Sequence, residues 1–357
     1  MIQQFIRQVG GLLLCFLVMI AAAPATAQQA PRRIVAVGDL HGDYESWLAI
    51  ARAAGLVNSS NRWAGGATTL VQLGDVTDRG PDSLKIIGHL RQLQRSAPRS
   101  GGRVITLVGN HEAMNLTGDL RYVDPGEFAA FAGRESRGRS DEFYTRNRGG
   151  IEASYRAQNP NSSAEQIRAA WEAEHPPGWV EHQIAWRPSS ELGRWTIGNP
   201  AVVKIGATLF VHGGLSAEYA TVPIEQINQR IADALRRRDE GETSIINDPL
   251  GPLWYRGLIA RNLQPETERA PTGSAAPARP RPPIEQELDA VLRAYGARRI
   301  VVGHTPSVQG IAIRHGGKLV QVDTGNSRAY KGRPSYLEIF GDRLVPHIVQ
   351  RPGERAR

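Results

Sequence analysis

Short apolar runs alternate with amphipathic stretches along most of the chain from residue 32. In the first part, runs rich in Val, Ile and Leu predict strands at 34–37, 68–73 and 104–108, and the stretches between them predict helices at 44–54 and 81–94. These strands are apolar at nearly every position, which is typical of a sheet covered on both faces. The pattern therefore predicts an α/β fold.

The pattern changes after Asn115. Residues 118–199 are polar and contain a helix-like stretch at 164–175. They also hold four of the seven tryptophans: Trp171, Trp179, Trp186 and Trp195. We interpret this region as a helical insertion that packs its indoles over the edge of the sheet. A small separate core and direct contact with a substrate are the alternatives for these indoles.

Strand and helix patterns return in the last part of the chain. They predict strands at 201–205, 207–211, 300–302, 319–322, 335–340 and 343–349, and helices at 223–237 and 284–295. Residues 265–283 contain six prolines among small residues, a composition that excludes a helix or a paired strand. We expect this proline-rich segment to be an exposed loop.

The first 27 residues have the layout of a secretory signal peptide. An apolar core at 11–23 precedes small residues in an A-x-A pattern at 25–27, and the core is shorter than the roughly 20 apolar residues that a membrane-spanning helix needs. We expect cleavage after Ala27, a domain formed by residues 28–357, a periplasmic or secreted location, and no stable membrane anchor after cleavage. An uncleaved anchor is the alternative.

The only cysteine, Cys15, lies within the predicted signal peptide. Cleavage would leave a chain without thiols, which excludes disulfide bonds and a cysteine nucleophile in the mature protein. The mature chain must then be stabilised by a hydrophobic core, which a chain of this length can form.

The chain is basic, with 43 Lys and Arg residues against 35 Asp and Glu residues and a net charge of +8. The positive charges do not form a one-sided stripe, since the densest run, 236–238, is followed directly by Asp239 and Glu240. We therefore predict a solvated surface that attracts anionic substrates, and no nucleic-acid partner.

Five polar motifs begin where five predicted strands end. Each motif contains glycine. The motifs are GDLHG at 38–42, GDVTDRG at 74–80, GNHE at 109–112, HGG at 212–214 and GHT at 303–305. Because the carboxyl ends of strands in an α/β sheet share one rim, we expect these five segments to meet at a single site.

The motifs supply a set of metal ligands without sulfur. The set has two carboxylates, three imidazoles and one amide oxygen, from Asp39, Asp75, His41, His212, His304 and Asn110. Mixed oxygen and nitrogen donors favour Mn, Fe or Zn over Ca and Mg. Six donors exceed the four of one structural zinc, so we predict two divalent metal ions.

The spacing of the ligands divides them between the two ions. Asp39 and His41 lie two residues apart on one loop and can reach the same ion. Asp75 is the natural bridging carboxylate, and the remaining three ligands would complete the second ion's site.

These motifs resemble those of the calcineurin-like metallophosphoesterases, in the phosphoprotein phosphatase branch. Thr77, Val108, the segment 254–257 and the GHT ending resemble most the bacterial Shewanella-like protein phosphatases. The resemblance covers residues 32–115 and 201–340 and includes no motif of the insertion or the proline-rich segment. It implies a metallophosphoesterase β-sandwich flanked by helices.

The expected reaction is hydrolysis of a phosphate ester by a hydroxide that two metal ions generate from a shared water. His111 is the candidate general acid and Asp78 would orient it. Arg79 offers a planar group that matches two phosphate oxygens, although it could instead form a buried ion pair. The resemblance adds Arg256 as a second phosphate ligand, and Asn110 is assigned to the phosphate as well as to the metals.

Three functions are compatible with this set of residues. The leading hypothesis is a metal-dependent phosphatase of phosphorylated proteins or peptides, and the resemblance implies phosphotyrosine as well as phosphoserine and phosphothreonine. The first alternative is a hydrolase of dinucleoside polyphosphates or another phosphoanhydride. The second is a metal-binding interaction protein without turnover, which the presence of both His111 and Asp78 argues against.

Overall fold

The computed structural model describes residues 32–261 and 281–351. The predicted signal peptide and residues 265–280 of the predicted loop lie outside the described residues. Among the described residues, no helix is both long and apolar enough to cross a membrane.

Two five-stranded sheets form the centre of the fold. The first has the strand order β10-β9-β1-β2-β3 and the second the order β4-β5-β6-β8-β7. Their bounds are β1 Ile34–Val37, β2 Thr69–Gln72, β3 Arg103–Thr106, β4 Val202–Ile205, β5 Thr208–Val211, β6 Arg299–Val302, β7 Ala312–Arg314, β8 Leu319–Gln321, β9 Ser335–Phe340 and β10 Arg343–Ile348. In each sheet three neighbouring strands run parallel, and antiparallel strands complete it.

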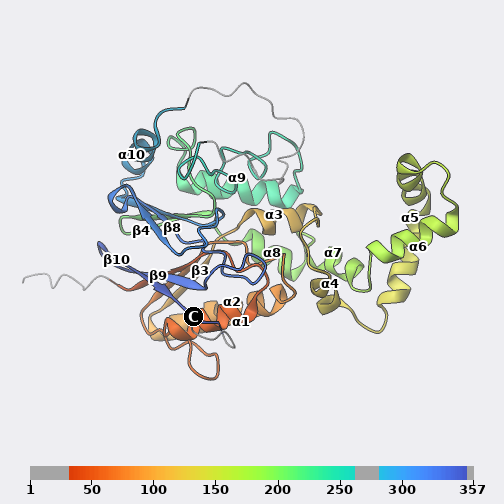
Figure 1. The fold of residues 1–357 in the computed structure, drawn as a ribbon, viewed down its shortest axis with the longest axis horizontal. Coiled ribbons are helices and arrows are strands. Elements are labelled where there is room, and N and C mark those ends of the chain that lie inside the picture. The colour runs from red at the N-terminus through yellow and green to blue at the C-terminus, as the bar shows by residue number, and fades with distance from the viewer. Residues whose placement is uncertain (1–31, 262–280, 352–357) are drawn as a thin grey trace, which may run out of the picture. The chain divides into compact units, whose positions relative to one another are not determined.

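The sheets pack face to face with one hydrophobic layer between them (Figure 1). Along β1, Ile34 and Ala36 point into this layer, while Val35 and Val37 belong to the core on the other face of the sheet. Both faces of the strand are therefore buried, which explains why its sequence is apolar at every position.

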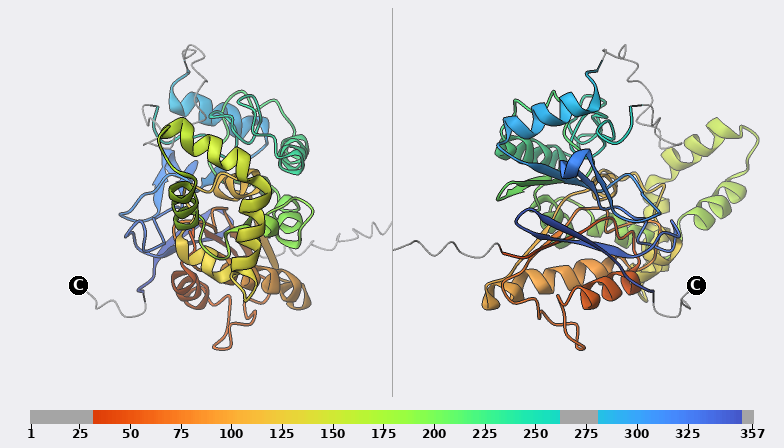
Figure 2. Two further views of the ribbon diagram at one scale, coloured as in Figure 1. Left: turned by 90° about the vertical axis from the view of Figure 1, so that its right-hand side faces the viewer. Right: turned by 60° about the vertical axis from the view of Figure 1, so that its left-hand side comes forward.

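Helices cover the outer face of each sheet (Figure 2). Helices α1 (Tyr44–Ala53) and α2 (Ser83–Ser96) pack on the first sheet, and α9 (Ile224–Arg237) and α10 (Ile284–Ala294) pack on the second. The prediction of an α/β fold with sheets flanked by helices is confirmed.

Residues 118–199 contain five helices and no strand. The helices are α4 Pro125–Phe131, α5 Ser136–Gln158, α6 Ala164–Glu174, α7 Trp179–Ala185 and α8 Glu191–Ile197. Trp171 is buried within this region, where its ring lies 4.8 Å from His175 and 6.3 Å from Trp179. Trp171 and Trp179 thus form the small separate core that was one of the alternatives, and they do not cover the sheet edge. Trp186 and Trp195 pack against the main core.

Some short elements have no clear signal in the sequence. Helix α3 (Asn110–Thr117) begins within the GNHE motif, where the hydrophobic pattern predicts no helix. Its first residues are buried although they are polar, so they do not produce the apolar spacing that identifies a helix. Strand β7 and the single-turn helices η1 (Ala97–Ser100) and η2 (His315–Gly317) were also not predicted.

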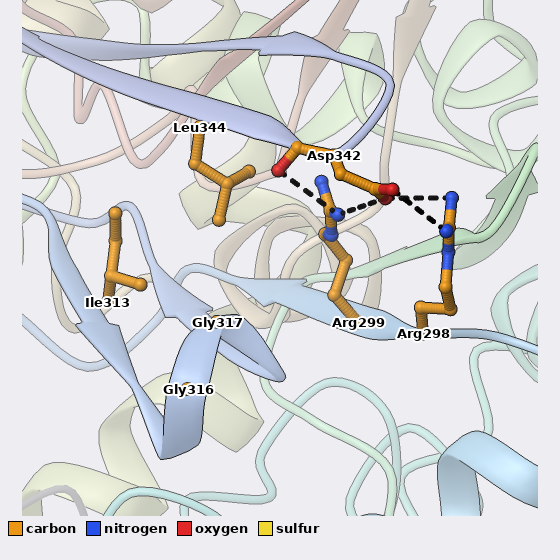
Figure 3. A pocket seen from close by; sticks show the side chains of 7 residues that line it. All are labelled: Arg298, Arg299, Ile313, Gly316, Gly317, Asp342 and Leu344. Carbon is orange, nitrogen blue, oxygen red and sulfur yellow. Dashed lines mark hydrogen bonds and ion pairs between the residues drawn. The ribbon is translucent and has the colours of Figure 1, made fainter.

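A pocket opens at the amino ends of the parallel strands, at the opposite end of β6 from the GHT motif (Figure 3). Arg298 and Arg299 line it, and both form ion pairs with Asp342 in the turn between β9 and β10, at 2.7 and 3.0 Å. These ion pairs connect the two sheets. A single carboxylate thus pairs with both arginines, and none of the predicted ligands lies in this pocket.

Phe210 of β5 allows a test of the layer between the sheets, because its ring is fully buried there. Phe210→Ala should lower the free energy of unfolding by about 3–5 kcal/mol, measured by urea denaturation, since it leaves a cavity between rigid sheets. Phe340 on β9 is 36% exposed and serves as the control. Phe340→Ala should cost less than about 1 kcal/mol; equal losses would mean that the ring of Phe210 does not fill the layer.

Candidate metal centre and active site

Five strand-end loops are tied to one another by hydrogen bonds. The backbone N–H groups of Leu40 and His41 donate to the carbonyl of Asp75, at 2.9 and 3.0 Å. On the other side, the N–H of Gly303 donates to the carbonyl of His212 at 2.8 Å. The structure thus brings all six predicted metal ligands to one place at the carboxyl ends of the strands.

Asp75 lies at the centre of this group. One set of side chains within mutual reach contains His41, Asp75 and His111, and a second contains Asp75, His212 and His304. The Oδ2 atom of Asp75 is 3.9 Å from His41 Nε2 and 3.2 Å from His212 Nε2. This position suits the predicted bridging carboxylate, although the bridging role itself stays a prediction.

Asp39 and Asn110 complete the surroundings of Asp75. His41 Nε2 lies 4.0 Å from Asp39 Oδ2, and His212 Nε2 lies 2.9 Å from Asn110 Oδ1. Each predicted ion therefore has an oxygen donor and an imidazole on its own side of Asp75.

The imidazoles present lone pairs toward the centre. Nδ1 of His41 hydrogen-bonds the carbonyl of Thr77 at 2.9 Å, and Nδ1 of His212 hydrogen-bonds the carbonyl of Leu73 at 2.8 Å. Since a carbonyl only accepts, each Nδ1 carries a hydrogen, which leaves Nε2 of neutral His41 as a ligand. Nε2 of His212 is a ligand when the ring is neutral; burial lowers the pKa of this imidazole, but the charge of Asp75 and the contact with it outweigh burial and raise it. Nε2 of His304 is buried without a hydrogen-bond partner, a costly state that a bound cation would relieve.

Burial keeps two of these histidines neutral, the form in which they bind metals. It lowers the pKa of His41 to about 3, with a further contribution from the charge of His111. Burial also holds the pKa of His304 well below its usual value, together with the positive charge of Arg256. For Asp75 burial acts in the opposite direction, but the charges of His212 and His111 outweigh it and hold the pKa of this carboxyl well below its usual range.

Asp323 is a buried carboxylate of the site that sequence reasoning missed. Burial and the charges of Asp323 and Asp75 raise the pKa of Asp39, and burial raises the pKa of Asp323 itself to about 6. The signal was present, because the polar residues Asp323 to Asn326 directly follow the end of an apolar strand, as the other motifs do. Buried carboxylates that repel one another in this way fit a site for cations.

The backbone of the site is held in a conformation that these residue types rarely adopt. Five residues of the site have positive φ, between 41° and 68°: His41, Asp75, Asp78, Arg79 and His304. In the described part of the chain only four other non-glycine residues do so. Such strain persists where the surrounding structure imposes it, as at functional sites.

Two glycines allow the loops to approach the carboxylates. A Cβ atom on Gly109 would overlap Oδ1 of Asp75, and one on Gly303 would lie 2.5 Å from Oδ1 of Asp39. Without a side chain at Gly303, the N–H of His304 reaches both Asp39 oxygens at 3.1 Å. A larger residue at either position would displace a predicted metal ligand.

Glu112 fixes the second motif loop. Its carboxylate accepts the backbone N–H groups of Asp75 at 2.8 Å, Val76 at 2.9 Å and Gly109 at 2.8 Å, and the hydroxyl of Thr77 at 3.1 Å. Glu112 therefore connects the start of α3 to the loop that carries Asp75. Both of its carboxylate oxygens accept hydrogen bonds in this role.

His111 and Asp78 form a close pair beside the predicted metal ligands. Nδ1 of His111 is 2.6 Å from Oδ2 of Asp78, and Nδ2 of Asn115 donates to the other Asp78 oxygen at 2.8 Å. Burial alone would lower the pKa of His111, but the charges of Asp75 and Asp78 and the hydrogen bond to Asp78 raise it to about 9. At neutral pH the imidazole is thus protonated and can serve as a proton donor.

The two predicted phosphate ligands have different surroundings. The guanidinium of Arg79 lies 4.4 Å from the ring centre of Tyr122 and 5.1 Å from that of Tyr330. Arg256 donates to the carbonyl of His304 at 3.0 Å and thereby holds the GHT loop. A role in phosphate binding stays a prediction for both arginines.

Aromatic side chains border the site. The ring of Tyr122 lies 5.2 Å from His111, that of Tyr330 lies 5.3 Å from His41, and that of Trp254 lies 5.6 Å from His304. All three are half-buried. Sequence reasoning gave Tyr122 and Tyr330 no role, since a single aromatic residue in a loop has no periodic signal.

Residues 32–308 match the family model of the calcineurin-like phosphoesterases. Shewanella-like protein phosphatase 2 of Arabidopsis thaliana is 32% identical over 336 residues, which cover 92% of this chain and 80% of the plant protein. Shewanella-like protein phosphatase 1 of Plasmodium berghei is 29% identical, over 86% of this chain and 71% of its own. The cold-active protein-tyrosine phosphatase of a psychrophilic Shewanella species has the same fold, with a TM-score of 0.61, 23% identity, and coverage of 90% of this chain and 81% of its own.

The central position of Asp75 leads to a prediction about metal content. The wild-type chain should bind about two divalent ions, and Asp75→Asn should retain fewer than about one, because both predicted sites share this carboxylate. The measurement is elemental analysis by mass spectrometry after exhaustive dialysis. His315→Ala is the control, since this imidazole is distant from the site and pairs with Glu285. Retention of one tightly bound ion by Asp75→Asn would show that Asp75 is not a bridge.

Proposed function

We propose that this chain, which belongs to the calcineurin-like phosphoesterase family and within it to the Shewanella-like protein phosphatases, hydrolyses phosphate monoesters on proteins with the help of two metal ions. One observation carries the proposal. The other five predicted ligands surround Asp75, and the pair of protonated His111 with Asp78 lies directly beside them.

The donor set supports Mn, Fe or Zn as the bound ions. It contains three imidazoles and no sulfur, which suits these borderline metals better than Ca or Mg. When bound, two such ions would polarise the phosphate and lower the pKa of a shared water to near neutrality.

The side chains of the protein would carry out the remaining steps. His111 donates its proton to the leaving oxygen of the ester, and Asp78 holds the imidazole in position through Nδ1. Arg79 and Asn110 contact the phosphate oxygens. The guanidinium of Arg79 is kept in place for this contact by the rings of Tyr122 and Tyr330.

Phosphorylated proteins are the substrates that we propose. Two relatives are named protein phosphatases, and a protein of the same fold is named a protein-tyrosine phosphatase. The half-buried rings of Tyr122, Tyr330 and Trp254 offer a surface on which the ring of a phosphotyrosine could pack. This surface supports phosphotyrosine as a substrate besides phosphoserine and phosphothreonine.

We also propose that the protein acts outside the cytoplasm, in the periplasm or after secretion, on the basis of the signal-like residues 1–27. If the full chain is expressed in a Gram-negative host, N-terminal sequencing of the folded product should begin at Gln28. A product in the periplasmic fraction that begins at Met1 would contradict cleavage.

A substrate comparison tests the function. The chain without residues 1–27, loaded with Mn, should release phosphate from a phosphotyrosine peptide, a phosphoserine peptide or both. Diadenosine tetraphosphate serves as the competing substrate. Cleavage of the dinucleotide alone would contradict the protein phosphatase assignment, and full metal binding without any cleavage would indicate an interaction protein.

The role of His111 leads to a prediction about leaving groups. His111→Ala should lower kcat/KM for phenyl phosphate by about 10²–10⁴-fold, because phenolate needs a proton donor. The loss should be much smaller for p-nitrophenyl phosphate, whose leaving group is a weaker base. Metal content should stay at the wild-type level. A loss of metal would instead mean that His111 is a ligand, which its distance from His41 and Asp75 would also allow.

A further inference from the structure

The turn formed by Asp78 and Arg79 is held by the first part of the insertion. The backbone N–H of Arg79 donates to the carbonyl of Tyr122 at 2.9 Å. The backbone N–H of Asp78 is a hydrogen-bond donor to the side-chain carboxyl of Glu127. Both turn residues have positive φ, and the N–H groups of both are met by residues of the insertion.

Glu127 lies on helix α4, and only 1% of its surface is exposed to solvent. The hydroxyl of Ser83, in the first turn of α2, donates to its Oε2 at 2.7 Å. Glu127 therefore connects α4 of the insertion to two points of the main fold, the start of α2 and the turn that carries Asp78.

His182 of α7 faces the other oxygen of this carboxyl. Its Nε2 lies 3.7 Å from Oε1 of Glu127, just beyond hydrogen-bond distance, and neither ring nitrogen nor Oε1 has a hydrogen-bond partner among the described residues. His182 is fully buried, and the rings of Phe128 and Phe131 enclose it at 5.2 and 5.0 Å. Polar atoms buried in this way are rare unless they interact with one another.

The two groups form a pair without net charge. Burial and the nearby charge of Asp78 raise the pKa of Glu127 to about 8, and burial lowers the pKa of His182 to about 4. Ser83 donates to Oε2, so Oε1, which faces His182, is the oxygen left to carry the proton of a neutral carboxyl. Glu127 can thus hold the turn without placing a second negative charge beside Asp78.

We propose that Glu127, paired with His182, is a positioning residue for proton donation: it holds the turn that presents the Asp78 carboxylate to His111. The inference rests on the proposed function. Glu112 holds Asp75 independently, so loss of the contact at Glu127 would displace Asp78 while leaving the metal ligands in place.

The test compares two leaving groups in variants of the metal-loaded chain. Glu127→Ala should lower kcat for phenyl phosphate by about 10–100-fold, the loss expected from a catalytic group misplaced by about 1 Å. It should lower kcat for p-nitrophenyl phosphate by less than about threefold, because that leaving group needs little proton donation. Glu127→Gln keeps an oxygen acceptor for Asp78 and an N–H donor for His182, and should restore most of the loss.

A matched control and a second variant complete the test. Glu152→Ala, on α5, removes ion pairs with Arg148 and Arg156 far from the turn and should change neither rate. If Glu127→Ala does not fold, Glu127→Asp withdraws the carboxyl from Asp78 by one methylene while leaving a smaller cavity than Ala, and should show the same dependence on the leaving group.

Two outcomes would overturn the inference. One is an equal loss on both substrates, and the other is an equal loss in the Ala and Gln variants, since each would indicate a general effect on the fold. Failure of the wild-type chain to hydrolyse any phosphate ester is a different result, because it would refute the proposed function itself.

Discussion

The structure depends on carboxylates buried together at the ends of the strands. Asp39, Asp75 and Asp323 are each almost inaccessible to water, and their charges raise one another's pKa values or are offset by imidazoles. Such an arrangement is stable only with positive charge among the carboxylates. The strained loops, the glycines that allow close approach and the unpartnered nitrogen of His304 all follow from the need to place these oxygens around cations.

The hydrogen bonds that hold the site come from two parts of the chain, the strand-end motifs and the insertion. Glu112 fixes the loop of Asp75 from within the strand-end motifs, whereas Tyr122 and Glu127 hold the neighbouring turn from the insertion. The remote helices α5 and α6 have their own aromatic cluster around Trp171 and contribute nothing that reaches these loops among the contacts described. The insertion thus combines a part that completes the site with a part that packs on itself.

Except for β7, the strands were predicted to within one or two residues at their ends. The central strands are buried on both faces and therefore form short, mostly apolar runs. Helix α3 was missed because function requires polar residues such as Asn110 and Glu112 inside it. Trp171 could not be placed from the sequence, since an indole in a polar region fits a separate core as well as a sheet edge.

The sequence by itself determined which residue types follow which strands, and hence that Asp39, Asp75 and His304 would meet at one rim. Only the tertiary structure decided how they are paired. The order of the strands places Asp75 between two groups of imidazoles, and chain segments distant in sequence bring Asp323 and Glu127 to the same region. The physical reason is that periodicity reports the burial of a residue's own strand or helix, whereas hydrogen bonds and charges between loops depend on how the strands are arranged in space.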